Sequence, residues 1–241
     1  MSVLPQATRE LGEFVAFLDD DDVWLAGNIR PHLALLDARP DFEAVFGQVQ
    51  LADSDLTPYG APWPDNPPPD GDFFRLMLSG YFPQVGATLV RARAVKAYGL
   101  MDESLIGDSD WDWQLRVARN HKIGFVPVTC VLFRQRPKGS FDGLQLTRTK
   151  FTRKIFIRHA LPNMRRWASP LGVLRSYYKA VSTYAVYFID TAAERIASGD
   201  RVGALRAVAA AFWVSPIHVA RDLLRPTSPL RAGHARKNAR S

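Results

Sequence analysis

The stretch that most constrains this chain spans residues 14–24, where five apolar residues lead directly into four aspartates. The apolar run 14–18 contains aromatic and β-branched side chains, which is typical of a strand buried on both faces. The carboxylates 19–22 then follow the C-terminal end of that strand, where open α/β sheets bind ligands. Four adjacent carboxylates repel one another, and clustered oxygens suit Mg²⁺, Mn²⁺ or Ca²⁺. We therefore expect a cation site here, and the alternative is a solvated acidic turn.

A second acidic cluster, Asp108-Ser109-Asp110-Trp111-Asp112, lies near the middle of the chain. Ser109 and Asp112 have the spacing of a capping box, so a helix is expected to begin here with Asp112 as a capping carboxylate. Asp110 would lie in the first turn, where the helix dipole favours its ionised form. An ionised carboxylate directed into a cleft can act as a general base, and the alternative is a structural N-terminal acid.

The first 140 residues mix helical and strand patterns, which predicts an α/β fold. Apolar spacing favours helices over 28–38, 72–79, 93–98 and 109–120, and strands over 42–51, 86–90, 123–126 and 129–134. A Pro-, Asp- and Gly-rich loop, 53–71, contains Trp63, which either stacks on a substrate ring or packs against the loop itself.

The pattern becomes helical from about residue 147, with the clearest helices expected over 177–197 and 202–214. Residues 231–241 are polar and basic without periodicity, which predicts disorder. We thus expect an α/β domain over 1–140, a helical region over 141–230 and a disordered tail over 231–241.

The net charge of +7 conceals a strong asymmetry between the two parts of the chain. Residues 1–140 carry 13 Lys and Arg against 19 Asp and Glu, whereas residues 141–241 carry 18 against 5. A basic segment of this kind suits nucleic acid, an anionic lipid surface or a polyanionic partner, and the alternative is a basic, partly frayed helical tail. The single cysteine, Cys130, fits a reducing compartment, and 207–220, the most apolar stretch, is too short to span a bilayer.

Several motifs, taken in order along the chain, resemble family 2 glycosyltransferases, which have the GT-A fold. The D-x-D stretch of that family is similar to the aspartates within 12–24. The segments that resemble its second half are GATLVR at 86–91, GLMDESL at 99–105, DWD at 110–112 with LR at 115–116, FVP at 125–127 and FR at 133–134. The resemblance covers roughly residues 7 to 140.

This resemblance implies a partial GT-A mixed sheet with flanking helices, followed by the α-helical C-terminal region. It also implies an inverting transfer of a sugar from a nucleotide-sugar donor to a saccharide or lipid-linked acceptor. Asp19 would face the donor's ribose and nucleoside, and Asp21, with Asp19, would hold a Mg²⁺ or Mn²⁺ ion that bridges the diphosphate. Asp110 would deprotonate the acceptor hydroxyl. Trp111 and Trp63 are candidate substrate contacts.

The chain departs from the family pattern at three points. Ser109 stands where the family usually has Glu, and Arg136 stands where many members have His, although an arginine can still bind the diphosphate. The family also has strands and helices that bind the nucleotide base before the aspartates. A βαβ unit takes roughly 30 residues or more, and this chain reaches the aspartates sooner, so about two βα units are expected to be missing. Their absence would leave the strand over 14–18 as an exposed apolar edge of the sheet.

Three hypotheses follow. The first is a metal-dependent glycosyltransferase of cell envelope polysaccharide synthesis, cytoplasmic and peripheral at the inner face of the membrane, with no nucleic-acid partner. It is expected to be active only if the native chain is longer or a partner completes it. The second is a catalytically incomplete remnant that binds a partner or a membrane through its basic helices. The third is a phosphohydrolase of the haloacid dehalogenase type, whose D-x-D-x-[TV] pattern fits residues 19–23. Activity on a phosphate ester would distinguish the third from the other two.

Overall fold

The computed structural model describes residues 12–64, 71, 73–135, 142–167, 169–225 and 228. Contacts between residues divide the chain into two compact units. The first comprises 1–77 and 81–137, and the second comprises 78–80 and 138–241.

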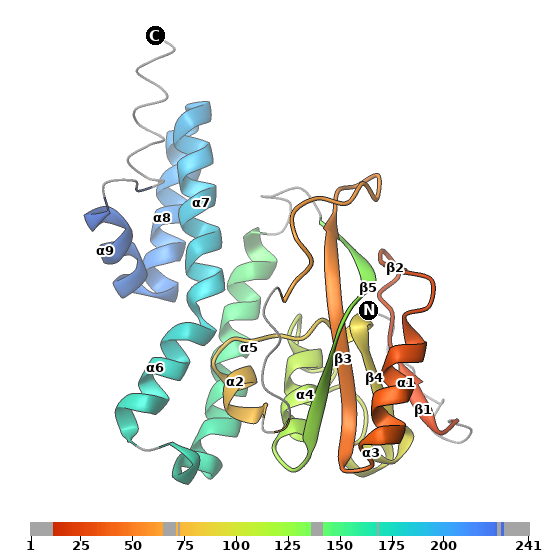
Figure 1. The fold of residues 1–241 in the computed structure, drawn as a ribbon. Coiled ribbons are helices and arrows are strands. Elements are labelled where there is room, and N and C mark those ends of the chain that lie inside the picture. Colours follow the sequence, from red (N-terminus) through yellow and green to blue (C-terminus); the bar gives the residue numbers. More distant parts are fainter. Residues whose placement is uncertain are drawn as a thin grey trace. The chain divides into compact units, whose positions relative to one another are not determined.

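A curled mixed sheet forms the centre of the first unit (Figure 1). Its order within the described residues is β1-β4-β3-β5-β2, with β3 and β5 parallel and the other neighbours antiparallel. As a result β1, β3 and β5 run in the same direction, and their C-terminal ends lie at one end of the sheet. The strands are β1 (Phe14–Ala16), β2 (Val23–Trp24), β3 (Phe42–Ala52), β4 (Thr88–Arg91) and β5 (Lys122–Arg134).

The strand before the aspartates is shorter and less buried than its apolar sequence indicates. β1 ends at Ala16, its residues are half-buried, and the side chain of Leu18 is 45% exposed. The reason is its position, because among the described residues β1 pairs with β4 alone and forms one edge of the sheet. The prediction of a strand buried on both faces is therefore wrong for this segment.

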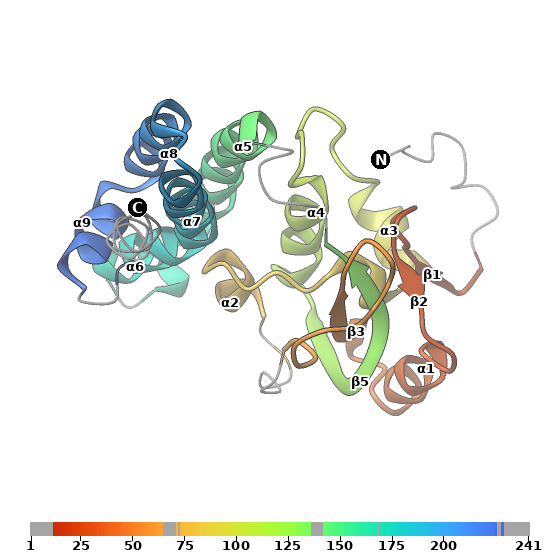
Figure 2. The same ribbon diagram turned by 90° about the horizontal axis from the view of Figure 1, so that it is seen from above.

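Helices cover both faces of this sheet, with α1 on one face and α3 and α4 on the other (Figure 2). Side chains of β3 alternate between the two faces: Val45 packs in a cluster with Leu36 of α1, whereas Phe46 lines a small cavity together with Trp113 of α4. β3 is therefore the strand that is buried on both sides. The helices of this unit are α1 (Ile29–Ala38), α2 (Phe74–Leu78), α3 (Ala92–Tyr98) and α4 (Ser109–Ala118), with a short 3₁₀ turn, η1 (Val85–Ala87), before β4.

Two segments of the first unit differ from the sequence-based expectation. Residues 122–134 form one continuous strand rather than two, and the register against β3 shifts between the pairs Phe46–Phe125 and Gln48–Thr129, on either side of Pro127. A bulge thus accommodates the proline without ending the strand. The predicted loop 53–71 partly folds back along β3, where Trp63 and Val49 exchange backbone hydrogen bonds of 2.8 Å.

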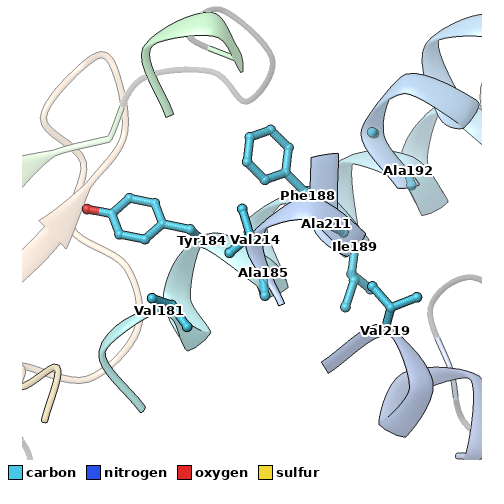
Figure 3. Packing of buried hydrophobic residues seen from close by; sticks show 10 residues of the cluster. Val181, Tyr184, Ala185, Phe188, Ile189, Ala192, Ala211, Val214 and Val219 are labelled. Atoms are coloured by element: carbon cyan, nitrogen blue, oxygen red, sulfur yellow. The ribbon is translucent and has the colours of Figure 1, made fainter. Parts of the chain in front are cut away.

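The second unit is helical, and its core lies between α7, α8 and α9 (Figure 3). The predicted helix 177–197 is divided at Val181 into α6 and α7, where the hydroxyl of Ser182 donates a 2.6 Å hydrogen bond to the carbonyl of Lys179. Such a local bond competes with the helical ladder. The elements are α5 (Asp142–Ala160), η2 (Leu161–Arg166), α6 (Pro170–Ala180), α7 (Ser182–Ser198), α8 (Arg201–Val214) and α9 (Pro216–Leu224).

The predicted fold class, a mixed α/β sheet with flanking helices followed by a helical C-terminal region, is confirmed. The predicted disorder of 231–241 concerns residues outside those that the structure describes. Within the described part of the chain, no helix by itself has the length and apolar composition of a membrane span. Only α8 and α9 taken together reach that composition, and they are bent by 117° at Ser215.

Candidate functional site

The acidic turn, residues 19–22, lies at the end of the sheet where β1, β3 and β5 finish. The chain must pass from β1 at one edge to β2 at the opposite edge, so the segment between them crosses this end of the sheet. Within the turn, the backbone N–H of Asp22 donates to the carbonyl of Asp19 at 3.2 Å. The carboxyl ends of strands are the usual ligand-binding edge of an α/β sheet.

Asp22 is the most buried side chain of the acidic turn. Its carboxylate accepts a 2.9 Å hydrogen bond from the backbone N–H of Arg134 and a 3.1 Å bond from the side-chain amide of Gln84. The pKa of Asp22 is raised to about 6, with burial as the largest cause; the hydrogen bond from Arg134 opposes this rise, and the charges of Asp19 and Asp21 contribute to it. Asp22 therefore fastens the turn to the end of β5.

Asp19 is partly buried and lies within 3.4 Å of the same Gln84 amide nitrogen. Burial is the largest cause that raises its pKa, followed by the charge of Asp21, whereas the bond from Gln84 lowers it. The Gln84 side chain also accepts a hydrogen bond from the backbone N–H of Gly86 in η1. One glutamine thus connects two aspartates of the turn to the segment that precedes β4.

Arg134 holds the backbone of the turn from the other side. Its Nε donates to the carbonyl of Asp21 at 2.8 Å, and its Nη1 donates to the carbonyl of Ser54 at 2.6 Å. The guanidinium therefore joins the turn to the loop that follows β3. Arg136, the predicted diphosphate contact, lies outside the described residues.

Sequence reasoning missed Gln84, Asp22 and Arg134 as parts of this site. Asp22 is the last of the four aspartates, directly before the apolar residues Val23 and Trp24. This position is the one local signal that distinguishes it from the other three aspartates. Gln84 carried no such signal, because Asp22 lies 62 residues away in sequence. Arg134 was singled out only as part of the FR segment at 133–134, and nothing local indicated its contact with Asp22 across 112 residues.

Asp19 and Asp21, both partly buried, are the two side chains of the turn that the sequence predicted as metal ligands. Among the described residues, no group of three or more His, Cys, Asp and Glu side chains is arranged to hold a metal ion. Mg²⁺ commonly binds through one or two carboxylates and takes its other ligands from substrate phosphates and water. The donors present thus fit a cation that arrives with a phosphate ligand, rather than a cation in a closed protein cage.

Asp110 lies in the first turn of α4, where its Oδ1 accepts a 2.8 Å hydrogen bond from the backbone N–H of Trp111. Trp113 and Gln114 follow it by three and four residues and share its side of the helix. The ring of Trp113 contacts that of Phe17, with centroids 5.5 Å apart, and the Gln114 amide donates to the carbonyl of Pro83 at 2.9 Å. Phe17 is two residues before Asp19 and Pro83 is next to Gln84, so this side of α4 is anchored to the segment that leads into the acidic turn and to the segment that contains its partner Gln84.

The prediction that Asp112 is a capping carboxylate of a box with Ser109 is wrong. The helix begins at Ser109 with Asp108 as its N-cap residue, and Asp112 is buried one turn further in. Its carboxylate forms a 3.1 Å ion pair with Arg116, whose guanidinium also donates to the carbonyls of Tyr98 and Leu100. Because a buried carboxylate requires a charged partner, Arg116 four residues later determines the position of Asp112.

The two tryptophans proposed as substrate contacts have different environments. Trp111 is 2% exposed; its indole N–H donates to the carbonyl of Met77 at 3.1 Å, and its ring packs edge-on against Phe82. This packing leaves no open ring face for a substrate. Trp63 is 38% exposed and lies beside the ring of Tyr81 with centroids 5.3 Å apart, so part of its surface is accessible.

Comparison with protein-family models gives no match, and neither does comparison with curated protein sequences. Among solved structures, the chain is similar to "S. aureus TarS 1-349 in complex with UDP", a glycosyltransferase. The TM-score is 0.42 and the sequence identity 13%, over 83% of this chain and 66% of that chain. The chain thus spans just under two thirds of the length of that structure. This similarity is distant and concerns the fold alone.

Proposed function

We propose that this chain is an inverting, metal-dependent glycosyltransferase that moves a sugar from a nucleotide-sugar donor to an acceptor hydroxyl. The observation that carries the proposal is the attachment of α4 to the acidic turn. Through Trp113–Phe17 and Gln114–Pro83, the helix that bears Asp110 is fixed against the segments that bear Asp19 and Gln84. Two separate groups of carboxylates therefore belong to one region.

The acidic turn is proposed as the donor end of this site. Asp21 and Asp19 would hold Mg²⁺ or Mn²⁺ together with the donor's diphosphate, and a bound cation would neutralise charge on the departing nucleoside diphosphate. Gln84 and Arg134 support this role because they hold the turn in one conformation before a ligand arrives. A site fixed in advance loses less entropy when it binds.

Asp110 is proposed as the general base at the acceptor end. Inversion requires the base and the leaving group on opposite faces of the sugar, so one carboxylate cluster cannot serve both roles. Asp110 stands on a different element from the acidic turn, in the first turn of α4. Trp63, with part of its ring accessible, is the remaining aromatic candidate for contact with a saccharide or lipid-linked acceptor.

The alternatives explain fewer of these observations. A phosphohydrolase would use the acidic turn but gives no role to Asp110 or to the attachment of α4. A non-catalytic binding protein requires neither the fixed acidic turn nor the second carboxylate. Activity assays distinguish the two alternatives from the proposal and from each other. The phosphohydrolase would cleave p-nitrophenyl phosphate, the binding protein would not, and neither would consume a nucleotide-sugar.

The proposal is tested with the full chain and a panel of UDP- and GDP-sugars, by following the release of nucleoside diphosphate with and without Mn²⁺. We expect release with at least one donor, its loss on chelation with EDTA, and inversion at the anomeric carbon by NMR. Cleavage of p-nitrophenyl phosphate without any use of a nucleotide-sugar would contradict the proposal.

A further inference from the structure

We propose that the outward face of α8 and α9 docks on the surface of an anionic lipid bilayer, with both helices lying along the membrane plane. The inference does not rest on the proposed chemistry, because it concerns only the second unit. It rests on an unusual distribution of side chains in α8, on the charges around it and on the burial of the acidic residue of α9.

The distribution of side chains in α8 is the reverse of that in an ordinary surface helix. Its inward face has small residues, and its outward face has large apolar ones. Val202, Leu205 and Phe212 are 64, 71 and 60% exposed. A surface helix of a water-soluble domain normally directs its apolar stripe towards the core. The buried residues are Gly203, Ala204, Ala207, Ala211 and Val214.

The outward apolar residues form one stripe along α8. At 3.6 residues per turn, Phe212, Leu205, Val202 and Trp213 fall within an arc of about 100°. Arg201 and Arg206 border this arc on its two sides, and both are exposed. Apolar side chains between flanking arginines are the pattern of a helix that lies in a membrane interface.

Trp213 is held at one end of this stripe. The guanidinium of Arg153, from α5, lies 4.3 Å from the centre of the Trp213 ring and donates to the backbone carbonyl of Trp213 at 2.8 Å. The indole remains 43% exposed. Trp is favoured where one end of a side chain is apolar and the other is wet, as at the boundary of a bilayer.

The next helix, α9, also has exposed apolar side chains, which are Ile217, Leu223 and Leu224. The acidic residue of this helix, Asp222, is buried instead and accepts a hydrogen bond from the hydroxyl of Ser228. No acidic side chain therefore lies on the exposed face of α9, while Arg221 is exposed there.

The positive charge of the helical unit indicates which kind of partner binds this face. Residues 142–225 carry 14 Lys and Arg against 5 Asp and Glu. A second copy of the chain would bring two such surfaces together, with repulsion between like charges. An anionic bilayer instead complements the arginines and receives the apolar stripe, and its attraction weakens with salt.

The test uses the full chain and flotation with two kinds of vesicle, phosphatidylcholine alone and phosphatidylcholine with phosphatidylglycerol. We expect binding to the anionic vesicles that weakens as salt is raised. The double variant Leu205→Gln/Phe212→Gln should lose at least tenfold in binding, and Arg201→Gln/Arg206→Gln should lose the preference for anionic lipid. The matched control, Ile157→Gln/Leu161→Gln, changes two exposed apolar residues of the same unit outside α8 and α9 and should bind as the parent does.

Circular dichroism and thermal melting establish that each variant is folded before its binding is compared. Equal binding by the parent and the Leu205→Gln/Phe212→Gln variant would overturn the proposal. So would an absence of vesicle binding together with a concentration-dependent dimer that this variant abolishes, because that result would assign the face to a second copy of the chain.

Discussion

The side-chain amide of Gln84 donates a 3.1 Å hydrogen bond to the carboxylate of Asp22, across 62 residues of sequence. The same nitrogen lies 3.4 Å from Asp19, so one amide restrains both ends of the acidic turn. Asp22 is held a second time by the backbone of Arg134. The position of the turn thus depends on contacts with the residues before β4 and at the end of β5.

The first prediction concerns Gln84 as a positioning residue. Gln84→Ala removes the donor that restrains Asp19 and Asp22, and we expect Mn²⁺-dependent binding of a nucleoside diphosphate to weaken about 10- to 100-fold, as for other groups that orient metal ligands. Titration calorimetry measures the loss. Gln50→Ala is the matched control, because Gln50 makes similar amide bonds to the carbonyls of Tyr59 and Gly60 in the loop after β3. An equal loss in both variants would argue against a specific role for Gln84.

The second prediction separates the two aspartates of α4. Asp110→Asn should lower the rate of sugar transfer about 10²- to 10⁴-fold, the usual contribution of a general base, while leaving nucleotide binding and thermal stability unchanged. Asp112→Ala should instead destabilise the fold by about 2–4 kcal/mol, because it leaves the guanidinium of Arg116 without its carboxylate. Rate assays and denaturant melts of both variants distinguish the roles. A large loss of stability in Asp110→Asn would make Asp110 a structural acid.

The third prediction concerns the close approach of β3 and β5 at Gly47. A Cβ atom there would meet the sulfur of Cys130 well inside contact distance and would lie 2.9 Å from the carbonyl oxygen of Val128. We expect Gly47→Ala to destabilise the protein by about 1–3 kcal/mol, the usual cost of overpacking a core. Gly12→Ala, where the nearest atom is 4.0 Å away, is the control and should melt as the parent does.

The fourth prediction concerns pH and the thiol of Cys130, which is fully buried. Burial raises its pKa from 9.0 to about 11. Between these values the unfolded chain has released the proton and the folded protein has kept it, so the free energy of unfolding should fall as pH rises from about 9 to about 11. Denaturant melts of the parent and of Cys130→Ala over this pH range measure the contribution of the thiol. The part of the fall in the free energy of unfolding that is due to Cys130 should be absent from the variant. A thiol reagent should modify the native protein only on unfolding, and fast modification at neutral pH would show that the site opens.

Elements with local signals agreed closely with the sequence-based expectation. Pro31 in the first turn of α1 and Gly99 at the end of α3, with a φ of 72°, are residues whose own chemistry determines local structure. The carboxylates of the acidic turn were also recognisable, because a run of four aspartates after an apolar strand is rare.

Features that depend on distant partners were not predictable in this way. The apolar run 14–18 indicated full burial, but burial depends on how many strands pair with β1. Asp112 matched a capping box, yet the guanidinium of Arg116 determined its position. The apolar pattern of α8 predicted a helix, and its alanines indicated close packing, but it did not predict that the large apolar residues would face outwards, since that orientation depends on packing.

The central claim is that the acidic turn binds a nucleoside diphosphate together with a divalent cation, and calorimetry tests it most directly. UDP and GDP, each with and without Mn²⁺, are titrated into the full chain, into Asp21→Ala and into Asp20→Ala. Asp20 is the exposed neighbour that serves as the control. We predict Mn²⁺-dependent binding by the parent and by Asp20→Ala, and its loss in Asp21→Ala. Binding of neither nucleotide by the parent, or equal binding by the parent and Asp21→Ala, would contradict the claim.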